Sequence, residues 1–473
     1  MKIWLSIRGY VFVFLFFILL VTPRGVSKGI FFDGLTYSSI ARNLAEGVGT
    51  FWNPYYTETI YPIFHELLPL QFYLQSFWFK IFGDQIWIEK MYGIFIMLLT
   101  ILFFILALKE LEKLCQDNEL SGSQTTRLCW SGFLFVILPM VIYSSLNNLL
   151  ENTVLLFVVL STFSVIKSFS SKASPFWSIL SGVFIMGAFL SKSIPGIFPL
   201  IIYPAAGIIF RKQGWLKRWC YQLSVVFALL IVIFIFSNEG KIAILNHLKQ
   251  QVFASIAGKR GTLGGRFTLL KCFIQEFSVP IVFALLLCGV KGWRFGRIQK
   301  FLLIIGLAGF LPLLISPKQA RRYILPSLPF FTASLGYCSV RGISRLKNKR
   351  VARIFNRVAI PLLVVVSIIL GILGAGKVYK NKNLWKEVLP VWDELQANKK
   401  RIIVQTCGFS PGWEEHAFYQ RYFKWSFGKG PYILQRVNVY CSLPSNIELL
   451  IDGPQIKLWA LKNGSFHIVE NRR

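Results

Sequence analysis

Long apolar runs alternate with short polar joints over most of the chain. Eleven of these runs are candidates to cross a bilayer, although several must extend into their flanks to reach the roughly 20 residues of a straight span. The pattern predicts a polytopic α-helical membrane protein. The runs lie near 9–24, 87–107, 128–146, 150–168, 176–191, 195–210, 219–236, 277–292, 298–316, 323–340 and 358–376.

One more apolar segment, Leu67 to Gly83, does not fit the alternation. It carries Gln71, Gln75 and Lys80, and Pro69 lies near its start. We interpret it as an interfacial or re-entrant helix, which leaves eleven transmembrane helices. The alternative topology has two further spans, so the expected number is 11–13.

The basic residues between the runs predict the orientation. Joints 211–218, 291–300 and 341–357 hold four, four and seven Lys or Arg, so we expect them on the cytoplasmic side. Counting outward from these joints puts the polar loops 25–86 and 237–275 on the outer side, together with everything after residue 376.

The chain changes character at residue 377. Residues 377–473 include 15 basic and 8 acidic residues and no run long enough to span. Within them, 401–407 and 447–452 have strand composition, and 412–425 has the apolar spacing of a helix. We therefore expect a transmembrane catalytic domain over 1–376 and a small α/β extracytoplasmic domain after it.

Composition agrees with this division and narrows the function classes. A chain with 54% hydrophobic and 16% aromatic residues is not a single soluble domain. The net charge of +31 does not indicate nucleic-acid binding, because Lys and Arg gather between the apolar runs, where they set topology and meet anionic membrane lipids. Cys407 and Cys441 are candidates for a disulfide, which needs an oxidising compartment.

Charged residues concentrate in the first outer loop, between Phe31 and Leu70. Asp33 and Tyr37 are one helical turn apart, and Asp33 is a good N-cap for a helix that follows it. Glu66 precedes the next apolar segment. These acids are explained if the loop is catalytic. The alternative is that Asp33 and Glu66 are only carboxylates at the starts of helices on the membrane surface.

Other outer turns carry charges that complement these acids. Glu151 and Lys192 each lie at a turn between runs. Lys318, Arg321 and Arg322 place three basic residues within five positions, against the positive-inside bias. Binding of a phosphate explains such a cluster, and contact with lipid head groups is the alternative.

The second outer loop, 237–275, contains Lys249, Lys259, Arg260 and Arg266. We interpret it as a lid or an acceptor-binding loop, with a disordered connection as the alternative.

These motifs resemble the GT-C membrane glycosyltransferases that use a polyprenyl-phosphate sugar, the group that includes protein mannosyltransferases and the aminoarabinose transferases of lipid A. In that family an Asp-Glu-x-x-Tyr-x-x-x-Ala-Arg element follows the first helix. Asp33, Tyr37, Ala41 and Arg42 match it, and Gly34 stands in place of the second acid.

A Glu-Lys/His-Pro-Pro-Leu element closes the loop in that family. Glu66, Pro69 and Leu70 match it, whereas Leu67 occupies the Lys or His position. A phosphate-binding side chain is therefore missing there, and His65 is the expected substitute.

Two later elements of the family are also matched. Lys192 is similar to the Lys of a Lys-Gly-x-x-Gly/Ala-x-x-Pro element, with Ser193 replacing the Gly. Arg322 and Tyr323 begin a match to Arg/His-Tyr-x-x-Pro-x-x-Pro, and Glu151 stands where the family has an acid at the start of an outer-facing helix.

The resemblance implies an inverting transfer of a sugar from a polyprenyl-phosphate donor to a lipid, glycan or protein acceptor at the outer face of a bacterial inner membrane. No metal ligand set is predicted, although the loop carboxylates leave a divalent metal open as a cofactor. A transporter or flippase for a lipid-linked anionic glycan is the main alternative, but we find no internal repeats or ionisable residues at the middle of spans. The resemblance implies catalytic roles for Asp33 (base) and Glu66, donor-phosphate binding by Lys192, Arg321, Arg322, Lys318 and His65, and supporting roles for Tyr37, Arg42, Glu151 and Tyr323.

Overall fold

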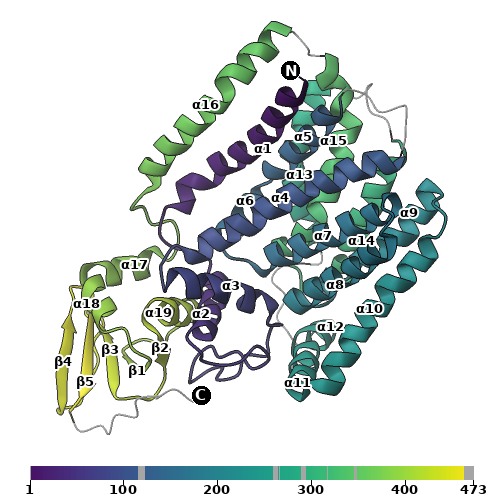
Figure 1. The fold of residues 1–473 in the computed structure, drawn as a ribbon. Coiled ribbons are helices and arrows are strands. Elements are labelled where there is room, and N and C mark those ends of the chain that lie inside the picture. The colour runs from purple at the N-terminus through teal and green to yellow at the C-terminus, as the bar shows by residue number, and fades with distance from the viewer. Residues whose placement is uncertain are drawn as a thin grey trace. The chain divides into compact units, whose positions relative to one another are not determined.

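The computed structural model describes residues 2–115, 123–258, 265, 267–288, 295–316, 318–345 and 349–462. The chain is mostly helical and forms two compact units (Figure 1). Unit 1 comprises Met1–Pro23, Glu66–Leu68 and Gly93–Leu373. Unit 2 comprises Arg24–His65, Pro69–Tyr92 and Gly374–Arg473.

Unit 1 is helical, and helices occupy each of the eleven apolar runs predicted from the sequence. Its shorter pieces are the 3-10 helices η1 (Ile194–Gly196), η2 (Phe198–Ile201) and η5 (Arg321–Ser327) and the π-helix η3 (Leu248–Phe253). The α-helices that lie wholly or mostly in unit 1 are α1 (Lys2–Gly25), α4 (Ile88–Cys115), α5 (Gln124–Val136), α6 (Pro139–Leu146), α7 (Leu150–Ser170), α8 (Ser174–Lys192), α9 (Ile202–Phe210), α10 (Trp215–Phe236), α11 (Asn238–His247), α12 (Ala254–Ile256), α13 (Thr268–Cys288), α14 (Arg297–Ile315), α15 (Leu328–Arg345) and α16 (Lys349–Gly374).

The chain is a multi-pass membrane protein. Among the described residues, six helices are long and apolar enough to cross a membrane, namely α4, α7, α8, α10, α13 and α14. The pair α5 and α6, bent by 64°, adds a seventh if it is one span, and three shorter apolar helices cover 9–25, 194–210 and 360–374.

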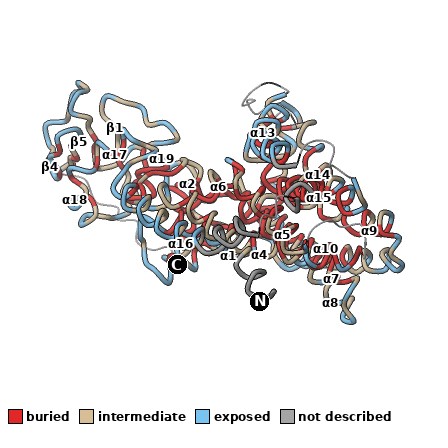
Figure 2. Tube along the Cα trace, turned by 90° about the horizontal axis from the view of Figure 1, so that it is seen from above, coloured by how far each residue is buried: buried red, intermediate tan, exposed pale blue. Residues whose placement is uncertain are grey.

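Helix α10 illustrates why a bilayer is required. Its apolar side chains Phe227, Ile231 and Ile235 are 55% to 69% exposed, and only Gln222 and Val226 on this helix are buried. Figure 2 shows how burial varies along the chain. A helix with such a surface is stable in hydrocarbon, because lipid tails are as apolar as the side chains.

Helix α3 (Leu70–Phe82) occupies the segment that left two topologies open. It has 13 residues. At 1.5 Å per residue it is about 20 Å long, which is shorter than the ~30 Å hydrocarbon core of a bilayer. This length favours the topology in which the segment does not span.

Unit 2 contains a five-stranded mixed sheet with the order β2-β1-β3-β5-β4. Strand β1 pairs in parallel with β2 and β3, with Val404 opposite Tyr432, while β5 is antiparallel to both β3 and β4. The strands are β1 (Ile402–Cys407), β2 (Trp425–Phe427), β3 (Tyr432–Arg436), β4 (Ile447–Asp452) and β5 (Ile456–Leu461). The predictions of β1, β4 and a helix near 412–425 are confirmed, whereas β2, β3 and β5 were not predicted.

Most helices of unit 2 pack with this sheet around one hydrophobic core, namely α2 (Phe32–Ala45), α17 (Lys382–Val388), the 3-10 helix η6 (Leu389–Val391), α18 (Trp392–Ala397) and α19 (Trp413–Phe423). Helix α3 lies outside this core and packs against α2, where Phe79 contacts Ala41 in a separate small cluster. Ile30 and Leu35 are buried in the same cluster as Trp385, Phe418 and Tyr422. The first outer loop and the C-terminal sheet therefore share a core. The functional division at residue 376 stays a prediction.

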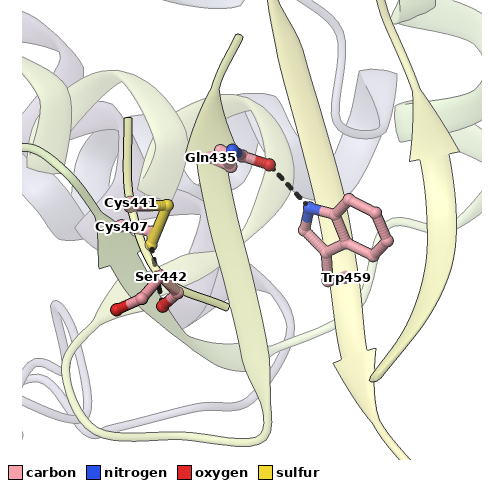
Figure 3. Close-up of a disulfide and its surroundings, with 5 residues drawn as sticks. All are labelled: Cys407, Gln435, Cys441, Ser442 and Trp459. Atoms are coloured by element: carbon pink, nitrogen blue, oxygen red, sulfur yellow. Dashed lines mark hydrogen bonds between the residues drawn. A yellow bond between two sulfur atoms is a disulfide. The ribbon is translucent and has the colours of Figure 1, made fainter. Parts of the chain in front are cut away.

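A disulfide joins Cys407, the last residue of β1, to Cys441 in the loop after β3 (Figure 3). Their Cα atoms are 5.7 Å apart. On the neighbouring strands β3 and β5, Trp459 Nε1 donates a hydrogen bond to Gln435 Oε1 at 3.1 Å. The pairing that the sequence left open is thus formed within unit 2.

Candidate functional site

Asp33 lies in the first turn of α2, in unit 2. The helix begins at Phe32 and its N-cap is Phe31, so the prediction that Asp33 is the N-cap is wrong. The rings of Phe31 and Phe32 lie 4.2 Å apart, and Phe32 packs against the core of unit 2, which fixes the helix start ahead of the aspartate. In the first turn the carboxylate still interacts favourably with the helix N-terminus.

The rest of α2 is buried from Gly34 to Asn43, which is unlike a helix that lies on a membrane surface. Asp33 itself is half-buried. Tyr37 packs on Phe72 of α3 with ring centroids 5.7 Å apart. Burial, and the negative charge of Asp33, raise the pKa of the Tyr56 hydroxyl. The aspartate is thus on a helix held by packing from several elements.

Arg42 anchors the other end of α2. Its side chain is buried, and Nη1 donates to the main-chain oxygens of Gln420 and Arg421 at 2.9 and 2.8 Å. These carbonyls belong to the last turn of α19, where main-chain acceptors lack partners inside the helix and a cation is favourable. Arg42 therefore joins α2 to the C-terminal part of the chain, and its supporting role in the site stays a prediction.

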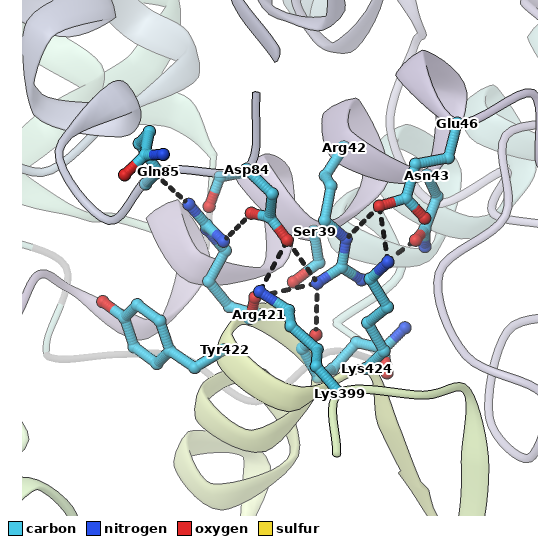
Figure 4. Close-up of polar contacts among 12 residues, drawn as sticks. Ser39, Arg42, Asn43, Glu46, Asp84, Gln85, Lys399, Arg421, Tyr422 and Lys424 are labelled. Carbon is cyan, nitrogen blue, oxygen red and sulfur yellow. Dashed lines mark hydrogen bonds and ion pairs between the residues drawn. The ribbon is translucent and has the colours of Figure 1, made fainter. Parts of the chain in front are cut away.

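Arg421 lies at the centre of a buried ion network (Figure 4). Its guanidinium is fully buried and donates to Asp84 Oδ1 at 2.6 Å, to the Gln85 main-chain oxygen at 2.7 Å and to Glu89 Oε2 at 2.9 Å. Lys399 Nζ lies 2.6 Å from Asp84 Oδ2. The network therefore links α19 to the turn that precedes α4.

The charges of this network shift each other's titration. Burial opposes ionisation of Asp84, but Arg421, Arg42 and Lys399 outweigh it and hold the pKa of that carboxyl below its usual value. Burial lowers the pKa of Lys399 to about 8, although Asp84 acts in the opposite direction. Near neutral pH both groups of the pair are therefore charged.

Glu46, just after α2, extends the same network. It pairs with Arg401 and with Lys424, whose Nζ lies 2.7 Å from Glu46 Oε1. Burial opposes ionisation of Glu46, yet the surrounding cations lower its pKa overall. The C-terminal end of α2 is thus tied by ion pairs and hydrogen bonds to residues after position 376.

His65, also in unit 2, contacts the tip of the first outer loop. Its Nε2 lies 3.0 Å from the Trp52 main-chain oxygen and 3.0 Å from Asn53 Oδ1. A carbonyl oxygen only accepts, so Nε2 carries the hydrogen. This nitrogen of His65 is therefore engaged in holding the loop.

Glu66 is held by the second outer loop, within unit 1. Gln251 Nε2 donates to Glu66 Oε1 at 2.8 Å, and His247 Nδ1 donates to the Glu66 main-chain oxygen at 2.8 Å. Both donors come from α11 and the π-helix η3, so this part of the predicted lid or acceptor-binding loop is helical. Lys249 is exposed there, and Lys259, Arg260 and Arg266 lie outside the described residues.

Glu151, Lys192 and Arg322 form a cluster in unit 1. Glu151 is in the first turn of α7, and its side chain is 2% exposed. Lys192, the last residue of α8, forms an ion pair and a hydrogen bond with Glu151 Oε1, and Arg322 Nε lies 3.4 Å from the same oxygen. Lys192 Nζ also lies 4.4 Å from the centroid of the Tyr323 ring. Two cations from different elements thus share one buried acid.

The residue after Lys192 is the one at which the sequence departs from the family motif. Ser193 has φ of +65°, a conformation that glycine adopts readily and other residues rarely do. Its hydroxyl is buried, and no described residue forms a hydrogen bond with it. The backbone at this position therefore has a conformation that suits glycine, although the residue is a serine.

Arg321 does not join this cluster. Its Nε donates to Glu276 Oε1 of α13 at 2.6 Å, and the main-chain N–H of Met140 donates to Glu276 Oε2 at 3.0 Å. Successive residues of a 3-10 helix point about 120° apart, so Arg321 and Arg322 of η5 face different neighbours. Lys318 is half-buried just before η5.

The predictions from the sequence did not include several of these residues. Glu89 lies inside the apolar run 87–107, and Glu276 immediately precedes the run that begins at 277. A carboxylate at such a position indicates a buried partner or a functional role, and that signal was available. Arg421, Gln251 and His247 carry no local signal, because their partners are far away in the sequence.

Among the described residues, no three His, Cys, Asp or Glu side chains are grouped so that they could hold a metal ion.

The arrangement of the helices and the sheet is that of a known fold. The chain has the GT-C fold of membrane glycosyltransferases, which confirms the resemblance at the level of the fold. The crystal structure of ArnT from Cupriavidus metallidurans bound to undecaprenyl phosphate matches with a TM-score of 0.63 and 13% identity, over 97% of this chain and 98% of that chain. The same protein in the apo state gives 0.65 and 14%, over 95% and 97%. No protein-family model and no curated protein matches the sequence.

Proposed function

We propose that the protein is an inverting glycosyltransferase that moves a sugar from a polyprenyl-phosphate donor to an envelope lipid, glycan or protein at the outer face of a bacterial inner membrane. The observation that carries the proposal is the cluster of Lys192 and Arg322 on the buried acid Glu151. The similar ArnT structure contains undecaprenyl phosphate, the lipid phosphate that such a donor would release.

The cluster suits a phosphate for electrostatic reasons. Glu151 fixes the ends of two long cationic side chains, so less conformational entropy is lost when an anion binds. Lys192 supplies a compact charge and Arg322 a planar fork of donors. As the bond between the anomeric carbon and the phosphate oxygen breaks, negative charge grows on that oxygen and the two cations stabilise it.

Asp33 is proposed as the general base. It takes the proton of the acceptor hydroxyl while that oxygen attacks the anomeric carbon from the side opposite the phosphate, so one displacement inverts the configuration. Glu66 orients the acceptor, and Gln251 fixes one of its carboxylate oxygens. Both ends of α2 are held by packing and ion pairs, so the position of Asp33 is set before the substrates bind.

The purified full-length protein in detergent tests this function. Extracts of envelope glycolipids and glycoproteins from cells without the gene identify the acceptor, and mass spectrometry then follows polyprenyl phosphate and glycosylated acceptor together. The proposal requires the two products to form in equal amounts. A glycolipid that changes sides of the membrane without losing its phosphate would identify a flippase.

Donor binding is tested with variants of the cluster. Lys192→Ala and Arg322→Gln should raise the donor KM by roughly tenfold or more and leave the acceptor KM close to the wild-type value, because a charge-assisted hydrogen bond contributes about 1.5–3 kcal/mol. Lys172→Ala, an exposed lysine at the start of the α8 region, is the matched control. An unchanged donor KM in both cluster variants contradicts the assignment.

A further inference from the structure

Basic side chains gather in unit 2 where two apolar helices end. Helix α1 ends at Gly25, with Arg24 in its last turn and Lys28 just after it. Helix α16 ends at Gly374, and the segment that follows it is rich in Lys. We call this group the basic collar. It consists of Arg24, Lys28, Lys377, Lys380, Lys382 and Lys386.

Main-chain hydrogen bonds hold the two segments of the basic collar side by side. The N–H of Lys28 donates to the Lys377 oxygen at 2.8 Å, and the N–H of Tyr379 donates to the Lys28 oxygen at 3.1 Å. Gly29 has φ of +84°, and a Cβ atom there would overlap the main-chain oxygen of Lys380. The close approach therefore depends on a glycine.

The end of α1 is fixed in the same region. Lys90 Nζ donates to the main-chain oxygens of Arg24 and Ser27 at 2.7 and 2.6 Å. Lys90 is 4% exposed, so it acts from beneath the surface and adds its charge to that of the basic collar. The arrangement is a built feature of the fold and does not depend on exposed side chains alone.

Aromatic rings lie beneath three of the cations. The guanidinium carbon of Arg24 is 5.3 Å from the ring centroid of Tyr379, and Lys28 Nζ is 5.2 Å from that of Trp385. Lys380 Nζ is 5.5 Å from the centroid of Phe31. Cation–π contacts orient these groups, and the rings add no negative charge of their own.

Carboxylates do little to neutralise the basic collar. Among the described acids, none lies within 4.0 Å of the charged groups of Arg24, Lys28, Lys377, Lys382 or Lys386. Glu414 acts on Lys380, and its Oε1 also accepts a hydrogen bond from Asn381 Nδ2 at 2.7 Å. The patch therefore has a strong net positive charge.

The neighbouring sequence places the basic collar at the edge of the bilayer. On α16, Ile368, Ile369 and Ile372 are 50% to 70% exposed, which is the surface of a helix that faces lipid tails. Lys377 follows the end of this helix by three residues. Lys, Tyr and Trp are enriched at the level of the head groups, and the basic collar contains or contacts all three.

We propose that the basic collar binds the phosphate groups of anionic phospholipids. The charge pattern of the joints puts this part of the chain on the outer side, where the positive-inside rule gives no reason for six cations. Anionic head groups supply a reason, because each nearby Lys or Arg strengthens the attraction. This binding does not depend on the reaction that the protein catalyses, so it stands or fails separately from the glycosyltransferase proposal.

Thermal unfolding of the full-length protein in dodecyl maltoside tests the proposal, since a ligand that binds the folded state raises Tm by an amount that grows with the logarithm of its concentration relative to Kd. Dioleoylphosphatidylglycerol should raise Tm at concentrations where dioleoylphosphatidylcholine does not, and 0.5 M NaCl should weaken the effect. The triple variant K377Q, K382Q and K386Q should bind phosphatidylglycerol roughly a hundredfold more weakly, because each cation near an anionic surface contributes about a fivefold factor.

A second triple variant provides the control for lost charge. Lys400, Lys429 and Lys462 are equally exposed, lie in the same unit and are outside the basic collar. K400Q, K429Q and K462Q together should keep the wild-type affinity for phosphatidylglycerol. Equal losses in the two triple variants, or no loss in the first, overturn the proposal. So does an equal rise in Tm with inorganic phosphate, which would indicate a site for a soluble anion.

Discussion

Arg421→Met removes the centre of the buried ion network and is the sharpest perturbation that the structure offers. The guanidinium is fully buried and contacts two carboxylates, Asp84 at 2.6 Å and Glu89 at 2.9 Å. Methionine has a similar length but leaves both acids without this partner. Removal of one member of a buried ion pair costs about 3–5 kcal/mol, because the other charge stays buried.

We expect the loss to fall near the middle of this range. Lys399 and Arg42 remain close to Asp84, so that carboxylate keeps part of its compensation. Glu89 is 0% exposed and loses the one cation paired with it among the described residues. A loss of about 4 kcal/mol corresponds to roughly a thousandfold change in the unfolding equilibrium constant of unit 2.

The assay is pulse proteolysis of the full-length protein in mild detergent over a series of urea concentrations, which reports the fraction of unit 2 that is open to cleavage. Arg436→Met is the matched control, because Arg436 is 24% exposed and pairs with Glu387 at 3.0 Å. A partly exposed pair contributes about 1 kcal/mol or less. Equal stabilities of the two variants would refute the reasoning.

Three further predictions concern stability. Ser193→Gly should raise the free energy of unfolding, measured in a thermal scan, by about 1 kcal/mol. The change removes an unfavourable positive φ and a buried hydroxyl without a described partner, and this gain outweighs the larger conformational entropy of glycine in the unfolded chain. A lower Tm would contradict this prediction. Replacement of Cys407 and Cys441 by Ser should destabilise unit 2 by up to about 4 kcal/mol for a separation of 34 residues, and an unchanged urea midpoint would argue against this. The pKa of Lys399 is about 8 in the folded protein and 10.5 ordinarily. Between these two pH values the unfolded chain binds more protons than the folded one, so the free energy of unfolding should rise with pH. Lys399→Gln should flatten this rise of stability with pH.

The sequence was sufficient for elements whose signal is local. Apolar runs located the helices of unit 1, and strand composition located β1 and β4. Strand β2 has only three residues, and so short a segment has no readable alternation. The same reasoning misplaced the start of α2, because packing of Phe31 and Phe32 outweighed the capping preference of Asp33.

Relations between distant residues were beyond a single sequence. Arg42 donates to a main-chain oxygen 379 positions away, and no periodicity records such a contact. Which acid each of Arg321 and Arg322 contacts likewise depends on the 3-10 geometry of η5. That geometry turns Arg321 toward Glu276 and Arg322 toward Glu151. The charge pattern predicted only that the cluster binds an anion such as a phosphate, and the family resemblance implied that both arginines hold the donor phosphate.

The central claim is that Asp33 serves as the base in sugar transfer from a polyprenyl phosphate. The most direct test is the rate at which the full-length protein releases polyprenyl phosphate in the presence of the acceptor, compared between wild type and Asp33→Asn. Glu58→Gln, which changes an exposed acid of the same loop, is the control. General-base catalysis contributes about 10²–10⁴-fold, so Asp33→Asn should be slower by that factor while Glu58→Gln keeps the wild-type rate. Equal rates for Asp33→Asn and wild type would contradict the account.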